Sequence, residues 1–158
     1  MRIEAKLEAM GLVLPAPMAS LGMRLPYANV RVHGGRAYVA GHGPLNPDGS
    51  VAARGKVGAD VTVEEGYRAA RLTALAMLAS LKRELDDLDR VTACLRVFGM
   101  VNAAPGFDRL PEVVNGCSDL LLELYGPKVG QHARCAVGLA ELPVGIPVEI
   151  EAEVAIDG

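Results

Sequence analysis

The last part of the chain alternates between apolar and charged side chains. Its apolar members are Val148, Ile150, Ala152, Val154 and Ile156, and the charged residues between them are Glu149, Glu151 and Glu153. Successive side chains of a β-strand point to opposite faces of a sheet, so this pattern predicts one buried face and one polar face. We therefore expect a sheet that the chain covers on one side, with the other side left for water, a ligand or a neighbouring subunit.

Three segments show the spacing of helices. The longest begins with a capping box, because Glu65 follows Thr62 at the third position, and apolar residues then recur at helical intervals up to Leu85. Two further helices are predicted at residues 3–10 and 111–125, where a glycine follows the last residue of each. The sequence therefore predicts two main helices and one short leading helix.

Segments typical of strands lie between and after these helices. A Gly-Gly pair in the middle of residues 29–40 predicts a β-hairpin, and residues 90–100 predict a single strand. Residues 132–140 and 147–156 predict two more strands, which we expect to form a second hairpin. The expected fold class is therefore α+β, with the main helices on one face of a mixed, mostly antiparallel sheet.

Composition limits the organisation of the chain. The 158 residues suit a single domain, 1–158, in which residues 1–25 form an N-terminal helix and connector. Hydrophobic residues make up 51% of the chain, yet no run approaches the roughly 20 apolar residues that cross a bilayer. We therefore expect no membrane association, and we interpret the surplus of apolar residues as a hint of a subunit interface.

Charge and cysteine content narrow the function classes further. The net charge is −3 and no block of like charge occurs, which argues against nucleic acid as a partner. The cysteines Cys94, Cys117 and Cys135 form no CxxC pair, and the N-terminus lacks an apolar signal core, so a reducing, cytoplasmic location is expected. The three histidines lack the spacing of zinc ligands, and no metal site is expected.

Arg134 is the residue that most suggests a binding site. Strand alternation places it on one face with Ala136 and places Cys135 on the other, which we expect to be the core face. A guanidinium among small side chains suggests a recess that holds a carboxylate through two parallel hydrogen bonds. The pattern also allows a surface ion pair between Arg134 and a glutamate of the last strand, and the residues alone do not separate these interpretations.

Several short motifs, taken together, resemble the Rid/YjgF family, whose members are reactive-intermediate deaminases also labelled L-PSP endoribonucleases. The motifs are Pro26-Tyr27, Ala40-Gly41-His42-Gly43-Pro44, Val114-Asn115, Ala133-Arg134-Cys135, Leu142-Pro143 and Val148-Glu149-Ile150-Glu151. The resemblance extends over roughly residues 27–156. The leading helix and the long stretch between Asn115 and Arg134 resemble the longer subgroup called chorismate-mutase-like endoribonucleases.

The resemblance implies a chorismate-mutase-like fold, a homotrimer with pockets between subunits, and no cofactor. In the family pattern, Arg134 binds the carboxylate of a small metabolite and Glu149 positions a water that attacks an imine carbon. The other pocket residues that the resemblance implies are Tyr27, Gly41, His42 and Asn115. The implied reaction is the hydrolysis of 2-aminoacrylate and related enamines or imines to 2-keto acids and ammonia.

The sequence departs from the family pattern at the pocket. Ala40 stands where many members have a hydroxyl residue, His42 where they have glutamine, and Cys135 one position before the usual cysteine. His42 is therefore either a pocket acid or base, or a hydrogen-bonded structural group. Two other functions stay open: a non-catalytic receptor for small carboxylates and an endoribonuclease. The net negative charge and the absence of paired histidines argue against the endoribonuclease function.

Overall fold

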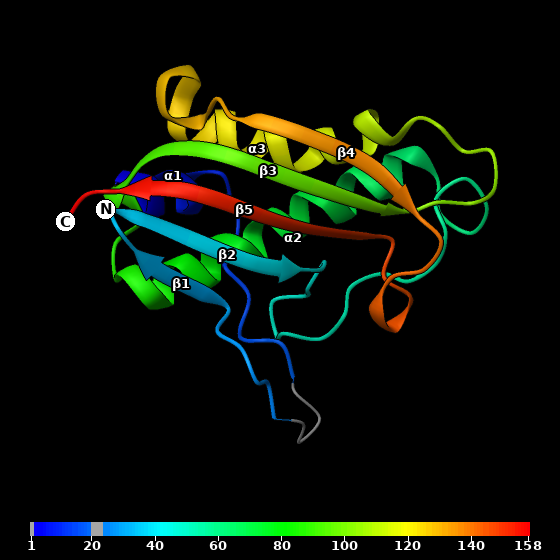
Figure 1. The fold of residues 1–158 in the computed structure, drawn as a ribbon, viewed down its shortest axis with the longest axis horizontal. Coiled ribbons are helices and arrows are strands. Elements are labelled where there is room, and N and C mark those ends of the chain that lie inside the picture. Colours follow the sequence, from blue (N-terminus) through cyan, green and yellow to red (C-terminus); the bar gives the residue numbers. More distant parts are fainter. Residues whose placement is uncertain (1, 20–23) are drawn as a thin grey trace.

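The computed structural model describes residues 2–19 and 24–158. Five strands form one sheet in the order β1-β2-β5-β3-β4, as Figure 1 shows. The strands are β1 (Val30–His33), β2 (Arg36–His42), β3 (Val91–Asn102), β4 (Ala133–Leu139) and β5 (Val148–Ile156). The helices are α1 (Arg2–Ala9), α2 (Val63–Leu85) and α3 (Leu110–Gly130), with the short 3-10 turns η1 (Leu88–Arg90) and η2 (Pro143–Gly145).

The two long helices, α2 and α3, pack against each other and against the same face of the sheet (Figure 1). Val97 and Ile150 of the strands meet Leu78 and Leu120 of the helices in the core, and all four side chains are fully buried. Strands β3 and β4 form a parallel pair, and the other strand pairs are antiparallel. The predicted α+β architecture, a mixed and mostly antiparallel sheet with two main helices on one face, is confirmed.

The short leading helix is also present. It buries Ile3 and Leu7, and Lys6 Nζ donates a hydrogen bond of 2.9 Å to the carbonyl oxygen of Leu124 on α3. The rest of the predicted N-terminal extension, residues 1–25, is described in part, because residues 1 and 20–23 lie outside the described residues. Within residues 2–19 and 24–158, no helix has both the length and the apolar character that a bilayer span requires.

Local sequence signals set the ends of several elements as expected. The Thr62 hydroxyl oxygen accepts from the Glu65 backbone N–H at 3.1 Å, and the Glu65 carboxylate accepts from the Thr62 N–H at 2.8 Å, which completes the capping box. Gly34 and Gly35 have positive φ angles of 59° and 72°, which the tight turn between β1 and β2 requires. Gly126 interrupts α3 with a φ of 75°, and a further short helical stretch follows it.

The expectation of a second hairpin is wrong. β4 pairs in parallel with β3, and β5 pairs antiparallel with both β2 and β3, so β3 lies between the last two strands. The parallel strands β3 and β4 are joined by α3, which is the kind of helical crossover that parallel pairing needs. The turn η2 then leads the chain to β5. The residue pattern identified the strands, but it carries no information on which strands pair.

The two faces of β4 are the reverse of the expectation. The register aligns Arg134 with Val97, which is buried under the helices, and aligns Cys135 with Phe98 on the uncovered face. Cys135 is exposed, and Arg134 lies on the opposite side of the sheet from the glutamates of β5. The physical reason is that β4 is an edge strand, so its helix-side face lies at the margin of the core, where Asn115 of α3 offers the guanidinium a polar partner.

Candidate functional site

A cavity of about 280 Å³ lies beside the end of β2. The connector before β1, the loop after β2, α2, η2 and the start of β5 all contribute to its wall. Four of the predicted site residues line it, namely Tyr27, Gly41, His42 and Glu149. Its apolar wall includes Leu25, Leu45, Val51, Val144 and Ile146. A hollow with apolar walls and a few convergent polar groups is the usual setting of a small-molecule site.

Gly41 of β2 and Glu149 of β5 approach each other closely in this cavity. A Cβ atom placed on Gly41 would lie 2.9 Å from Glu149 Oε2 and 3.1 Å from its Cδ, so the glycine leaves room for the glutamate side chain. Burial, and to a smaller extent the charge of Glu151, raises the pKa of Glu149. The Glu149 side chain makes no hydrogen bond or ion pair with any other described residue. Its carboxyl group is therefore available to a water molecule or a ligand.

His42 uses both ring nitrogens within the protein. Its Nδ1 lies 2.5 Å from the carbonyl oxygen of Ala40, and its Nε2 lies 2.8 Å from the hydroxyl oxygen of Ser80. Because a carbonyl can only accept, Nδ1 carries the proton, and Nε2 of the neutral ring accepts from Ser80. Burial, together with the nearby charge of Arg83, lowers the pKa of His42. These contacts favour the structural interpretation of His42 over an acid–base role.

Arg134 of β4 and Asn115 of α3 form a second group of predicted residues. Arg134 Nη1 donates to Asn115 Oδ1 at 2.7 Å and to Ser118 Oγ at 3.2 Å. Both partners are neutral, and Arg134 has no carboxylate partner in the part of the chain that the structure describes. Its Nε and Nη2 groups make no hydrogen bond to the described residues, so they remain available to hold a planar anion.

The two groups of residues do not meet within one copy of the chain. The first group surrounds the cavity beside β2, whereas Asn115 and Arg134 lie at the β4 edge of the sheet. Strand β3 separates β5 from β4, and Glu149 and Arg134 lie on opposite faces of the sheet. A site that uses both groups therefore needs a second copy of the chain.

Comparison with known proteins decides the family. A family model described as "YjgF/chorismate mutase-like, putative endoribonuclease" matches residues 4–146. The chain belongs to the YjgF/chorismate mutase-like family. Protein TCP17 of Trypanosoma cruzi is 40% identical to it over 156 residues, which cover 99% of this chain and 95% of TCP17. The family resemblance of the short motifs is thereby confirmed.

Solved structures share the fold of this YjgF-family chain. A protein of unknown function from Agrobacterium tumefaciens has a TM-score of 0.89 and 37% sequence identity, and the match covers 98% of this chain and 92% of that one. A "putative endoribonuclease" from Shewanella oneidensis has a TM-score of 0.88 and 31% identity, with 99% of this chain and 100% of that one covered. A Rid-family protein from Yersinia pestis, with a TM-score of 0.60 and 18% identity over 91% of this chain and 98% of its own, shares the fold.

The sequence interpretation of this YjgF-family protein missed several residues of the cavity wall, and two of these are polar residues of α2. Ser80 and Arg83 both line the cavity from α2, and Arg83 Nη2 donates to Ser80 Oγ at 3.0 Å. Ser80 lies within the apolar stripe of α2 and is buried, so a polar residue in an apolar stripe is the signal that identifies it. Arg83 gives no such signal, because an arginine near the end of an amphipathic helix is typical of a solvent-facing position.

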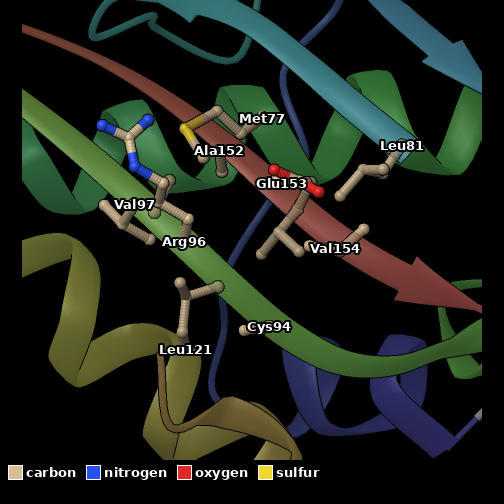
Figure 2. A pocket seen from close by; sticks show the side chains of 11 residues that line it. Met77, Leu81, Cys94, Arg96, Val97, Leu121, Ala152, Glu153 and Val154 are labelled. Carbon is tan, nitrogen blue, oxygen red and sulfur yellow. The ribbon is translucent and has the colours of Figure 1, made fainter. Parts of the chain in front are cut away.

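The gap in the core that Figure 2 shows is too small for a metabolite. It lies between α2, α3, β3 and β5 and has a volume of about 10 Å³, which is room for about one water molecule. Burial raises the pKa of the nearby Cys94 to about 12, and burial also raises the pKa of Cys117 to about 12. Neither thiol is therefore a nucleophile at neutral pH.

A group of carboxylates lies at the start of α1. Glu4, Asp87 and Asp89 each place an oxygen within 4.8 Å of the others. The Asp89 carboxylate accepts hydrogen bonds from the backbone N–H groups of Arg2 and Ile3, at 2.6 Å and 3.0 Å. A carboxylate at a helix N-terminus is stabilised by the helix dipole, so these contacts explain Asp89 as a cap for α1.

Proposed function

We propose that this protein hydrolyses small 2-imino acids, and the enamines that tautomerise to them, to 2-keto acids and ammonia. The observation that carries the proposal is the uncommitted carboxyl group of Glu149, which lies against Gly41 in the wall of an apolar cavity. Membership of the YjgF family supports the same assignment. The substrates we have in mind are of the 2-aminoacrylate kind.

Glu149 would act on the water that is consumed in the reaction. The carboxylate orients this water towards the imine carbon and accepts a proton from it as the new C–O bond forms. The proton passes to the nitrogen, the C–N bond breaks, and one 2-keto acid and one ammonia leave for each water used. The raised pKa of Glu149 makes it a stronger base than an ordinary carboxylate, which suits this role. The hydrolysis needs no redox partner or cofactor.

Arg134 would hold the substrate carboxylate, from a second copy of the chain in a homotrimer. Two hydrogen bonds from Nε and Nη2 would fix the carboxylate and present the imine carbon to Glu149. The uncovered face of the sheet supports such an assembly, because it exposes Tyr38 and Cys135. Free cysteines, including an exposed one, suit a reducing compartment, and we place the reaction in the cytoplasm.

The test couples the purified protein to an L-amino-acid oxidase and traps the released imine with semicarbazide. Wild-type protein is expected to reduce semicarbazone formation, because it removes the imine before trapping. Glu149→Gln and Arg134→Ala are expected to abolish this effect. The control is Glu153→Gln, which changes another carboxylate on the same face of β5, outside the cavity, and should keep the activity. Unchanged trapping with wild-type protein would rule out the proposed hydrolysis.

A second candidate is carboxylate binding without turnover. The uncommitted donors of Arg134 favour it, because they form a receptor whether or not a water is activated nearby. This function predicts that a 2-keto acid raises the melting temperature of the wild type and not of Arg134→Ala. Semicarbazone formation would then be the same with and without the protein.

A further inference from the structure

The cavity beside β2 contains a cation of its own chain, Arg83 of α2. Arg83 Nη2 donates to Ser80 Oγ at 3.0 Å, and Nη1 donates to the carbonyl oxygen of Pro15 at 3.4 Å. Neither partner is charged, and no carboxylate of the described residues pairs with Arg83. By contrast, Arg36 and Arg71 form ion pairs with glutamates at 2.7 Å and 3.0 Å. The charge of Arg83 is therefore not balanced by an ion pair with a described residue, and a ligand in the cavity can balance it.

A directional chain of hydrogen bonds holds Arg83 in place. The carbonyl oxygen of Ala40 accepts from His42 Nδ1, so His42 Nε2 accepts from the Ser80 hydroxyl, and a lone pair of Ser80 then accepts from Arg83. Ser80 is only 4% exposed, so water does not compete for its hydroxyl group. His42 thereby acts as a positioning residue for the guanidinium.

The rest of the cavity wall suits an apolar ligand body. Large hydrophobic side chains that are exposed in this fold gather there: Met18, Leu25, Tyr27 and Val144 are 50%, 38%, 55% and 63% exposed and all line the cavity. Exposed apolar side chains that surround one hollow mark a binding surface. Glu149 is the one carboxylate among the described lining residues, and its charged form directs an anion away from itself and towards Arg83.

We propose that this cavity binds a small monocarboxylate with an aliphatic body, and that Arg83 is the receptor for its carboxylate. The carboxylate lies against α2, and the aliphatic body lies among the apolar side chains of the connector and η2. Every residue of this site comes from one copy of the chain. Arg83 therefore holds the carboxylate without help from Arg134, and binding requires neither assembly nor imine hydrolysis.

Hexanoate binding, measured by isothermal titration calorimetry, tests the assignment, with 1-hexanol as the matched uncharged probe. Wild-type protein is expected to bind hexanoate about tenfold or more tightly than hexanol, because the guanidinium forms charge-assisted hydrogen bonds. Arg83→Gln is expected to lower hexanoate affinity by about the same factor and to leave hexanol binding unchanged. The control is Arg68→Gln, which removes another exposed arginine of α2 and should have no effect.

Ser80→Ala tests the positioning chain, and it should weaken hexanoate binding less than Arg83→Gln does. Wild-type affinity in Arg83→Gln, or equal affinity of the wild type for the two probes, would overturn the assignment.

Arg134→Gln separates this inference from the proposed function. Hexanoate binding that survives Arg134→Gln supports Arg83 as the receptor. Hexanoate binding that is lost in Arg134→Gln and kept in Arg83→Gln places the carboxylate at Arg134 and overturns the inference. A failure of imine hydrolysis with intact hexanoate binding affects only the proposed function.

Discussion

The neighbours of Glu149, Arg83 and Arg134 determine what each of these charged side chains can bind. Burial and the charge of Glu151 favour the protonated form of Glu149, which lies against Gly41. Arg83 and Arg134, by contrast, are held by neutral oxygens only. Glu149, Arg83 and Arg134 thus have no ion-pair partner among the described residues, so they can engage an anionic ligand and a water.

Glu149→Gln should change how the stability of the protein depends on pH. The pKa of Glu149 is raised above its usual value of 4.5 in the folded protein, so folding favours the protonated carboxyl group. This stabilisation is present at low pH and is lost as the pH rises through the raised pKa. Glu149→Gln is therefore expected to be more stable than wild type at neutral pH, with a difference that shrinks as the pH falls through the raised pKa and no longer changes below 4.5. Urea unfolding across this range measures it, and a difference independent of pH would contradict the buried environment.

Single residues were predicted from the sequence to different degrees. Strand alternation correctly placed Glu149 and Glu151 opposite the buried face of β5. It failed for Arg134, because small side chains on both faces of an edge strand do not indicate which face the helices cover. Only the family resemblance placed Asn115 and Arg134 in one pocket, and their hydrogen bond was not predicted, since no residue spacing brings a helix residue to a strand 19 positions away.

At the scale of elements, the turn η2 shapes the cavity wall. Val144 has a φ of 51°, in the left-handed region that β-branched residues rarely adopt. Two hydrogen bonds hold the turn from outside: Arg54 Nε donates to the Val144 carbonyl at 3.1 Å, and the Gly55 N–H donates to the Gly145 carbonyl at 2.8 Å. Backbone strain of this kind persists where the surrounding contacts fix it, often beside a ligand.

Val144→Asn should relieve this strain and weaken ligand binding. Asparagine adopts the left-handed region more readily than valine, and little apolar burial is lost because Val144 is 63% exposed. The free energy of unfolding is therefore expected to rise by about 1 kcal/mol, while hexanoate affinity falls with the loss of an apolar wall. Urea unfolding and calorimetry measure the two effects. Val13→Asn, at another exposed valine, is the control that should give no gain in stability, and a less stable Val144→Asn protein would argue against strain at η2.

The elements themselves were predictable where their signals are local. The capping box of α2, the Gly-Gly turn between β1 and β2, and the glycine that interrupts α3 each act within a few residues of sequence. The strand order β2-β5-β3-β4 depends on contacts between distant segments. The expected hairpin of β4 and β5 therefore failed, although both strands had been identified.

At the scale of the whole molecule, the sheet is covered by helices on one side only (Figure 1). The other face mixes charged and apolar groups: Tyr38 is 43% exposed, Cys135 is exposed, and Arg36 pairs with Glu153 at 2.7 Å. Part of the apolar surplus in the composition is thus found on this face and not in the core. We expect further copies of the chain to cover it, which would give the Arg134 edge of one copy access to the cavity of another.

Phe98→Lys should separate these copies without unfolding the chain. Phe98 lies on the uncovered face, and its cross-strand neighbour on β5 is Glu151, so the new lysine gains a partner of opposite charge within one copy. Burying that charge between copies is unfavourable. Light scattering is expected to give three times the chain mass of 16.6 kDa for the wild type and a single chain mass for the variant, with unchanged circular dichroism. The control, Leu122→Lys at an exposed position of α3, should remain trimeric.

The same variant distinguishes the two carboxylate receptors, Arg83 and Arg134, by the assembly that each requires. Imine hydrolysis is expected to be lost in Phe98→Lys, because Glu149 and Arg134 lie on opposite faces of the sheet within one copy and no longer share a pocket. Hexanoate binding is expected to be retained, because Arg83 and the apolar wall belong to a single chain. A monomeric variant that still hydrolyses imines would show that Arg134 of a second copy is not needed, and it would leave Arg83 as the carboxylate receptor for the reaction as well.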